Sequence, residues 1–168
     1  MADPTLAVTG LAVTAVLLVC SAFFSSSETA IFSLSSEAVE ATTGGGSRDL
    51  KELFADPHRL LVTLLVGNNV VNIAISSVLT VVVVSYLPTG VAVVAATLFT
   101  STVVLVFGEI VPKSYGLANA QRWALRVAPV VRGVERALSP VITVFDWVTG
   151  RITDWIDGES HIERPYLD

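Results

Sequence analysis

Residues 60 to 108 read LLVTLLVGNNVVNIAISSVLTVVVVSYLPTGVAVVAATLFTSTVVLVFG, and not one of them is Asp, Glu, Lys, Arg or His. As a single helix this run would be about 73 Å long, more than twice the roughly 30 Å hydrocarbon core of a bilayer. It contains one turn signal, Pro88 followed by Gly90, because these two residue types together interrupt regular structure. We therefore predict two transmembrane helices, residues 60–85 and 91–115, joined by a very short loop.

A second charge-free run, from Pro4 to Ser27, predicts another transmembrane helix. Its apolar character continues past Glu28, so we expect this helix to cover residues 5–34. A signal peptide is a poor fit, because it begins with basic residues and the only charge ahead of this run is Asp3. The chain is 52% hydrophobic and 15% charged, against roughly 25% charged in soluble domains. The expected fold class is an all-α membrane protein with three transmembrane helices.

The ten Lys and Arg residues fall in two regions of the chain. Three lie between the first and second spans and seven lie at or beyond the end of the third, whereas the N-terminus and the Pro88 loop have none. Because basic loops face the cytoplasm, we expect a plasma-membrane protein with its N-terminus outside and its C-terminus inside. The net charge of −5, without a basic patch beside stacking aromatics, excludes nucleic acid as a partner. Cys20 is the only cysteine, which excludes an intrachain disulfide.

The predicted organisation has three parts. Residues 1–115 form the three-helix transmembrane domain, with residues 35–59 as its cytoplasmic loop. Residues 116–157 form a juxtamembrane helical region, and residues 158–168 form a polar tail. We expect the helical pattern of the juxtamembrane region to break at Pro129, Gly133 and Pro140. An amphipathic helix at the membrane interface follows, although a piece of a soluble core is the alternative; its apolar positions are Val141, Phe145, Val148, Ile152 and Trp155.

The first two predicted spans each carry polar residues on one face: Ser21, Ser25 and Glu28 on the first, and Asn68, Asn72 and Ser76 on the second. On the third, Gly108 and Glu109 end the charge-free run. Asn68 and Asn72 lie about 12 and 18 Å from the cytoplasmic start of the second helix. Glu28 and Glu109 lie about 9 Å from the cytoplasmic ends of their helices. All three polar groups thus fall in the inner half of the bilayer. A carboxylate within a membrane is by default a functional group. Oxygen ligands without histidine or thiol suit Mg²⁺, Ca²⁺ or Na⁺, so we expect a cation site shared between the three helices.

Pro112 bears on this site because it has no backbone N–H to donate to the carbonyl of Gly108, four residues earlier. We expect a free carbonyl at Gly108, next to the carboxylate of Glu109, and a hinge at Pro112. Three alternatives stay open. Serines in a span often bond their own helix, and asparagines often join helices to one another. Lys113 is placed to pair with Glu109 at i,i+4. Glu28 is a ligand, a proton carrier or a packing residue.

Three motifs resemble those of the transmembrane domain of the CorC/CNNM family. They are FSSSETA at residues 24–30, GNNVVN at residues 67–72 and FGEIVPK at residues 107–113, similar to the family's F-S-G-S-E-T-A, G-N-N-L-V-N and F-G-E-I-x-P-K. Ser26 departs from the family's glycine. The resemblance covers residues 5 to about 157. It implies a homodimeric Mg²⁺ transporter, generally an exporter, with Na⁺ as a possible coupling ion; the positions that match the family's binding and motif residues are Ser25, Asn68, Asn72, Gly108 and Glu109.

The resemblance also implies a cytosolic pair of CBS motifs that bind ATP-Mg²⁺. The chain stops before that region, so we expect no ATP site in it and no nucleotide control. Our leading hypothesis is Mg²⁺ transport, with charge supplied by Glu109 and Glu28. The alternatives are a Na⁺ or H⁺ transporter and a non-transporting anchor or sensor for a cytosolic domain. We expect no enzyme, because the spans contain no Ser–His pair, HExxH motif or paired aspartates.

Overall fold

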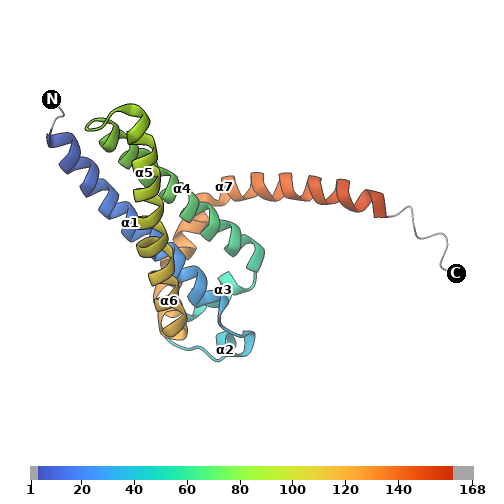
Figure 1. The fold of residues 1–168 in the computed structure, drawn as a ribbon. Coiled ribbons are helices and arrows are strands. Elements are labelled where there is room, and N and C mark those ends of the chain that lie inside the picture. Colours follow the sequence, from blue (N-terminus) through green and yellow to red (C-terminus); the bar gives the residue numbers. More distant parts are fainter. Residues whose placement is uncertain (1–3, 161–168) are drawn as a thin grey trace.

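The computed structural model describes residues 4–160, without the side chains at positions 89, 146, 149–150 and 152–160. All regular structure in this part of the chain is helical, as predicted. In chain order the elements are α1 (Pro4–Phe32), α2 (Ser36–Glu40), α3 (Ser47–Phe54), α4 (Pro57–Val84), α5 (Thr89–Val103), η1 (Val104–Ile110), α6 (Val111–Ala118) and α7 (Ala120–Ser160). Figure 1 shows α1, α4 and α5 side by side, with α2 and α3 at one end of them.

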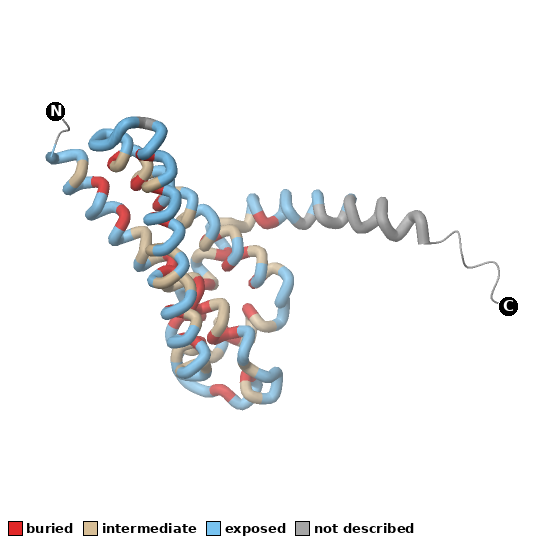
Figure 2. The backbone as a smooth tube through the Cα atoms, in the orientation of Figure 1, coloured by how far each residue is buried: buried red, intermediate tan, exposed pale blue. Residues whose placement is uncertain are grey.

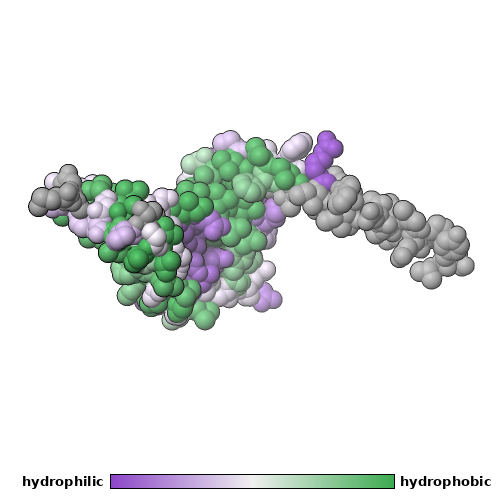
Figure 3. Space-filling view, turned by 45° about the horizontal axis from the view of Figure 1, so that its top comes forward, coloured by the Kyte–Doolittle hydropathy of each residue, from purple (hydrophilic) through white to green (hydrophobic). Residues whose placement is uncertain are grey.

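Within residues 4–160, three helical stretches are long and apolar enough to cross a membrane, which confirms the predicted number of spans. They are Pro4–Phe32, Pro57–Val84 and Gly90–Ala118, and each begins and ends within three residues of the predicted range. Much of their outer surface is apolar and exposed, as a lipid environment requires, and Figure 3 shows apolar side chains over much of one face. The expected orientation in the membrane stays a prediction.

The buried core lies at the end of the molecule that holds α2 and α3 (Figure 2). It joins the end of α1, both short helices, the start of α4 and the first half of α7, through Ala30, Ile31, Val39, Leu50, Leu53, Leu60, Leu64, Ala124, Val127, Ala128 and Val131. The segment expected as a cytoplasmic loop, residues 35–59, is therefore a packed part of the fold. It holds the end of α1 and the start of α4 in fixed relative positions.

Local sequence explains where the helices of this segment begin. The Ser35 hydroxyl accepts a hydrogen bond from the backbone N–H of Ala38 at 3.2 Å, which caps α2. Asp56 caps α4 in the same way by accepting from the N–H of Arg59 at 3.0 Å, and Pro57 follows at the first helical position. Gly46, before α3, has a φ of +82°, and a Cβ there would strike the backbone oxygen of Leu125 on α7. Only glycine fits this turn against α7.

The predicted breaks in the juxtamembrane region are wrong at all three positions. The helix α7 runs without interruption from Ala120 to Ser160 and includes Pro129 and Pro140. An internal proline disfavours a helix by about 3 kcal/mol, but the first half of α7 buries apolar side chains against α1, α3 and α4, and such packing overrides local preference. The second half leaves the body of the molecule (Figure 1). There Val141, Phe145 and Val148 are exposed, while the side chains of Ile152 and Trp155 lie outside the described residues.

The third span is less regular than predicted. Residues 104–110 form a π-helical turn, η1, in which the N–H of Val111 bonds to the carbonyl of Val106, five residues earlier. A regular α-helix would need Pro112 to donate to Gly108, and proline has no N–H. A wider turn at this point shifts the hydrogen-bond register ahead of the proline. Such π-helical turns are frequent at functional sites.

Candidate cation site

A layer of polar side chains lies where α1, α4 and η1 meet. The Ser21 hydroxyl on α1 is 2.7 Å from Oδ1 of Asn72 and 3.3 Å from Oδ1 of Asn68, both on α4. Nδ2 of Asn72 points to a carboxylate oxygen of Glu109 on η1, at 3.5 Å. We call these four residues the polar layer. The structure thus brings together three of the predicted site residues, Asn68, Asn72 and Glu109.

Gly108 allows the helices to meet at this layer. A Cβ at Gly108 would lie 2.7 Å from the Ser21 hydroxyl oxygen, closer than real Cβ contacts. The residue is buried, and α1 packs directly against η1. Glycine at this position therefore lets the backbone next to Glu109 reach α1, which places the predicted Gly108 beside the polar layer.

Ser21 was absent from the predicted ligands, although it could have been included from the sequence alone. It lies one turn before Ser25 on the same face of α1, so spacing alone did not favour one serine over the other. Ser25 itself is wholly buried, and its hydroxyl has no hydrogen-bond partner in the structure. Ser26 and Ser27 instead donate to the carbonyl of Phe23, at 3.1 and 2.7 Å. Ser25 therefore keeps an oxygen that the protein leaves uncommitted.

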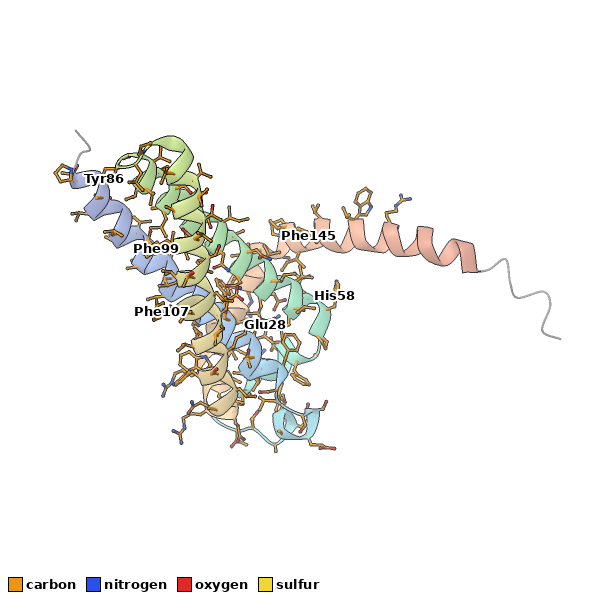
Figure 4. The ribbon with its side chains drawn as sticks, viewed as in Figure 1. Glu28, His58, Tyr86, Phe99, Phe107 and Phe145 are labelled. Carbon is orange, nitrogen blue, oxygen red and sulfur yellow. The ribbon has the colours of Figure 1, made fainter. Side chains whose placement is uncertain are left out.

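Glu28, the sixth predicted site residue, is held apart from the polar layer. It lies on the half of α1 nearer α2 (Figure 4), with its carboxylate 3.3 Å from Nζ of Lys113 on α6. The pairing of Lys113 with Glu109 that the sequence left open does not appear among the described ion pairs. Lys113 instead joins α6 to α1. Pro112, the predicted hinge, is buried. In the sequence it directly precedes Lys113 and follows the end of η1 by two residues.

The polar layer is rich in acceptors and poor in charge. Two amide oxygens face the single hydroxyl hydrogen of Ser21, and the Glu109 carboxylate faces only the amide nitrogen of Asn72. Glu109 has no ion-pair partner among the described residues. No group of three His, Cys, Asp or Glu side chains within the described part of the chain could hold a metal. A cation here would therefore be held by amide, hydroxyl and carbonyl oxygens with Glu109 as the one anionic ligand, a set that suits Mg²⁺, Ca²⁺ or Na⁺.

A second polar group, which the sequence analysis missed, joins α3, α4 and α7. Arg59 donates to Glu135 at 2.8 Å and to Ser139 at 2.7 Å, and Arg132 bonds Glu135 at 2.8 Å and Glu52 at 3.0 Å. We call these five residues the charged cluster. The hydrogen bond to Glu135 raises the pKa of Arg132 above its ordinary value. The partners are 76 to 80 positions apart in three of these contacts, so no local pattern revealed them.

Ser26, which departs from the family's glycine, helps to dock α7. Its hydroxyl accepts a hydrogen bond from the indole Nε1 of Trp123 on α7 at 3.0 Å. Its backbone lies so close to α6 that a Cβ at Gly116 would strike the Ser26 carbonyl oxygen. Ser26 therefore joins α1, α6 and α7 and takes no part in the polar layer.

Comparison with known proteins places these features in a family. The family model described as the cyclin M (CNNM) transmembrane N-terminal domain matches residues 12–168. A UPF0053 protein of Haemophilus influenzae is 31% identical over 138 residues, covering 80% of this chain and 32% of that protein. A UPF0053 inner membrane protein of Escherichia coli is 31% identical over 133 residues, covering 77% of this chain and 31% of that protein.

A chloroplastic DUF21 domain-containing protein of Arabidopsis thaliana is 35% identical over 157 residues, covering 91% of this chain and 23% of that protein. The chain thus spans about a third or less of the length of these relatives. The match over nearly its whole length, together with three helices able to span a membrane, shows that this is a multi-pass membrane protein that belongs to the CNNM family through its transmembrane N-terminal domain.

Proposed function

We propose that this domain moves Mg²⁺ across the membrane through a site at the polar layer. The observation that carries the proposal is the convergence of Ser21, Asn68, Asn72 and Glu109 from three spans on one point. An unpaired carboxylate is costly inside a membrane. A cation held by Glu109 and the surrounding neutral oxygens compensates that cost, which explains why an acceptor-rich group is found here.

The choice of Mg²⁺ among the hard cations comes from the family resemblance, and the ligand set is compatible with it. Mg²⁺ takes six oxygen ligands in close octahedral geometry and gives up its waters reluctantly. Ser25 has a buried hydroxyl without a partner, and Gly108 brings backbone next to the layer. With Asn68, Asn72 and Glu109, these groups supply most of an octahedral shell, and water completes it. Glu28 is held by Lys113, so we assign it to a gate on the α2 side of the site.

Transport requires the site to open to both faces of the membrane. Glu109 belongs to the π-helical turn η1, and Pro112 follows it by three residues; this segment is the irregular part of the third span. We assign the opening motion to this segment, with the Glu28–Lys113 ion pair breaking and reforming. Export, coupling to Na⁺, a homodimeric assembly and a cytoplasmic C-terminus belong to the proposal through the family resemblance and the distribution of basic residues.

The test is Mg²⁺ flux into proteoliposomes that contain the 168-residue chain and an entrapped Mg²⁺ indicator, with and without a Na⁺ gradient. We expect flux from the wild type that responds to the Na⁺ gradient and is lost in Asn72→Ala. Asn69→Ala is the matched control, since Asn69 is exposed on the same helix and should retain flux.

Other outcomes separate the rival functions. Flux of Na⁺ or H⁺ without Mg²⁺ would identify a monovalent-cation transporter. No flux of any of these ions, from protein shown to be folded and inserted, would contradict the proposal and favour an anchor for a cytosolic domain.

A further inference from the structure

A cavity of about 300 Å³ adjoins the polar layer and opens between α4, α5 and η1. Two of its wall residues, Asn72 and Glu109, belong to the polar layer. The other lining residues lie between the polar layer and the Pro88 loop. Ser76 is one turn beyond Asn72 on α4, and Thr100 is more than two turns before Glu109 in the third span. The remaining lining residues are Ser101, Val104 and Leu105.

Thr100 is the unusual member of this lining. Its side chain is 5% exposed, and its hydroxyl oxygen has no hydrogen-bond partner. Other threonines in the same span bond their own helix: Thr97 donates to the carbonyl of Val93 and Thr102 to that of Leu98, both at 2.8 Å. A buried hydroxyl without a partner costs free energy. Thr100 lines the cavity although its hydroxyl oxygen is buried. Rotation of the threonine side chain about its Cα–Cβ bond, which has two favoured positions in a helix, brings the hydroxyl to the cavity wall, where an entering group can bond it.

The chemistry of the cavity fits a hydrated cation. Its polar lining consists of three hydroxyls and an amide beside one carboxylate. A water molecule takes about 30 Å³ of liquid volume, so the cavity has room for an ion with a shell of six waters. Mg²⁺ releases such waters slowly, and a transporter that strips them at one layer needs an adjacent place where the hydrated ion waits.

We propose that Thr100, with Ser76 and Ser101, forms a second subsite that holds hydrated Mg²⁺ on the Pro88 side of the polar layer. This subsite presupposes the Mg²⁺ transport proposed above and adds a residence point to its path. The Thr100 hydroxyl bonds the water shell of the ion while the first waters exchange for Asn72 and Glu109. The subsite acts on the rate of passage, and the polar layer sets the affinity.

The first test compares Thr100→Val, which removes the hydroxyl and keeps the shape, with Thr100→Ser, which keeps the hydroxyl. We expect Thr100→Val to slow Mg²⁺ flux about tenfold, the effect of losing one hydrogen bond to a water of the ion's shell. Thr100→Ser should transport like the wild type, and Mg²⁺ binding measured by calorimetry should stay within about twofold in both variants. The matched control is Thr97→Val, because Thr97 bonds its own helix and is exposed.

The second test does not depend on transport. In a Cys20→Ser background, Ser76→Cys is treated with a methanethiosulfonate reagent that carries a trimethylammonium group. We expect this water-soluble cation to label the cavity and Mg²⁺ to slow the labelling severalfold. Ser77→Cys is the control, because Ser77 donates to the carbonyl of Ile73 and does not line the cavity; its labelling should not respond to Mg²⁺.

The outcomes of the two tests are distinct. Labelling of Ser76→Cys that Mg²⁺ leaves unchanged overturns the subsite, as does flux in Thr100→Val equal to that of Thr97→Val. If the wild type shows no Mg²⁺ flux, the transport proposal fails, and Mg²⁺ protection of Ser76→Cys still decides whether the cavity holds the ion.

Discussion

The polar layer and the charged cluster are both groups of polar side chains that join distant helices, but their chemistry differs. In the charged cluster, Arg59 and Arg132 meet Glu52 and Glu135 at 2.8 to 3.0 Å. Charges are balanced and each has an opposite partner, so the cluster needs no added ion, although Nε of Arg132 is buried without a hydrogen-bond partner. In the polar layer the acceptors outnumber the donors, and the bonds range from 2.7 to 3.5 Å.

This comparison shows how a polar group that stabilises helix packing differs from a polar group that binds a ligand in a membrane domain. A group of paired charges stabilises the packing of α3, α4 and α7, and its loss should lower the unfolding temperature. A group with surplus oxygens and one carboxylate without an ion-pair partner is completed by a cation, and its loss should weaken cation binding and reduce transport. The predictions below test each side of this distinction.

The largest expected effect is that of Glu109→Gln. This change removes the one charge of the polar layer and keeps its shape. Loss of a partner outside the ligand shell already weakens metal sites by roughly 10- to 100-fold, so we expect Mg²⁺ binding to fall at least about 100-fold and flux to disappear. Thermal unfolding of the purified protein without Mg²⁺ should change little. Unfolding at a much lower temperature would assign Glu109 to structure and break the comparison.

Glu135→Ala should have the opposite profile. The Glu135 side chain is 7% exposed, and its removal leaves two arginines without their shared partner. Breaking a fully buried ion pair on one side costs about 3 to 5 kcal/mol. Because the two arginines are 29% and 24% exposed and Arg132 keeps Glu52, we expect a smaller loss and a correspondingly lower unfolding temperature in detergent. Below that temperature the variant should still bind Mg²⁺. A variant of unchanged stability that had lost Mg²⁺ binding would reverse the roles of the two groups.

Gly108→Ala should have an intermediate effect. The new Cβ would lie 2.7 Å from the Ser21 hydroxyl oxygen, and overpacking of this kind costs about 1 to 3 kcal/mol. Adding Ser21→Ala removes that oxygen and should restore the unfolding temperature while flux stays low, because the polar layer has lost a hydroxyl. Full flux in the double variant would show that Ser21 takes no part in the site.

The smallest expected effect is the pH dependence of the charged cluster. The hydrogen bond from Arg48, helped by Arg132, holds the pKa of Glu52 below its ordinary value of 4.5. The ion pairs of Glu52 therefore stabilise the fold fully above that pH, and their contribution is lost as the pH falls through the lowered pKa. Unfolding temperatures measured between pH 7 and pH 3 should decline more for the wild type than for Glu52→Gln. An equal decline of the unfolding temperature in the two proteins would show that the ionised Glu52 does not contribute to stability through the charged cluster.

The helices and most of the polar layer were predictable because they depend on local patterns. Charge-free runs reveal spans, since each residue in lipid must be apolar or satisfied within the protein. Helical spacing predicted that Asn68 and Asn72 share one face of their helix. Their depth in the bilayer, in the same inner half as Glu109, predicted that Glu109 lies near them. The same reasoning was unable to choose between Ser21 and Ser25, because both lie on the inward face of α1, one turn apart.

The remaining features depend on packing between segments that are distant in sequence. The continuous α7 exists because its first half is buried against α1, α3 and α4, which outweighs two internal prolines. Lys113 pairs with Glu28 rather than Glu109 because α6 lies against α1. The charged cluster likewise joins residues that only the folded chain brings together.

The most direct test of the account is isothermal titration of Mg²⁺ into three proteins: the wild type, Glu109→Gln and Glu135→Gln. All three should be titrated in the same detergent, well below the unfolding temperature of Glu135→Gln. We predict saturable binding to the wild type and to Glu135→Gln, and none to Glu109→Gln over the same concentration range. Wild-type affinity in Glu109→Gln, or lost binding in folded Glu135→Gln, would contradict the assignment of the polar layer as the cation site.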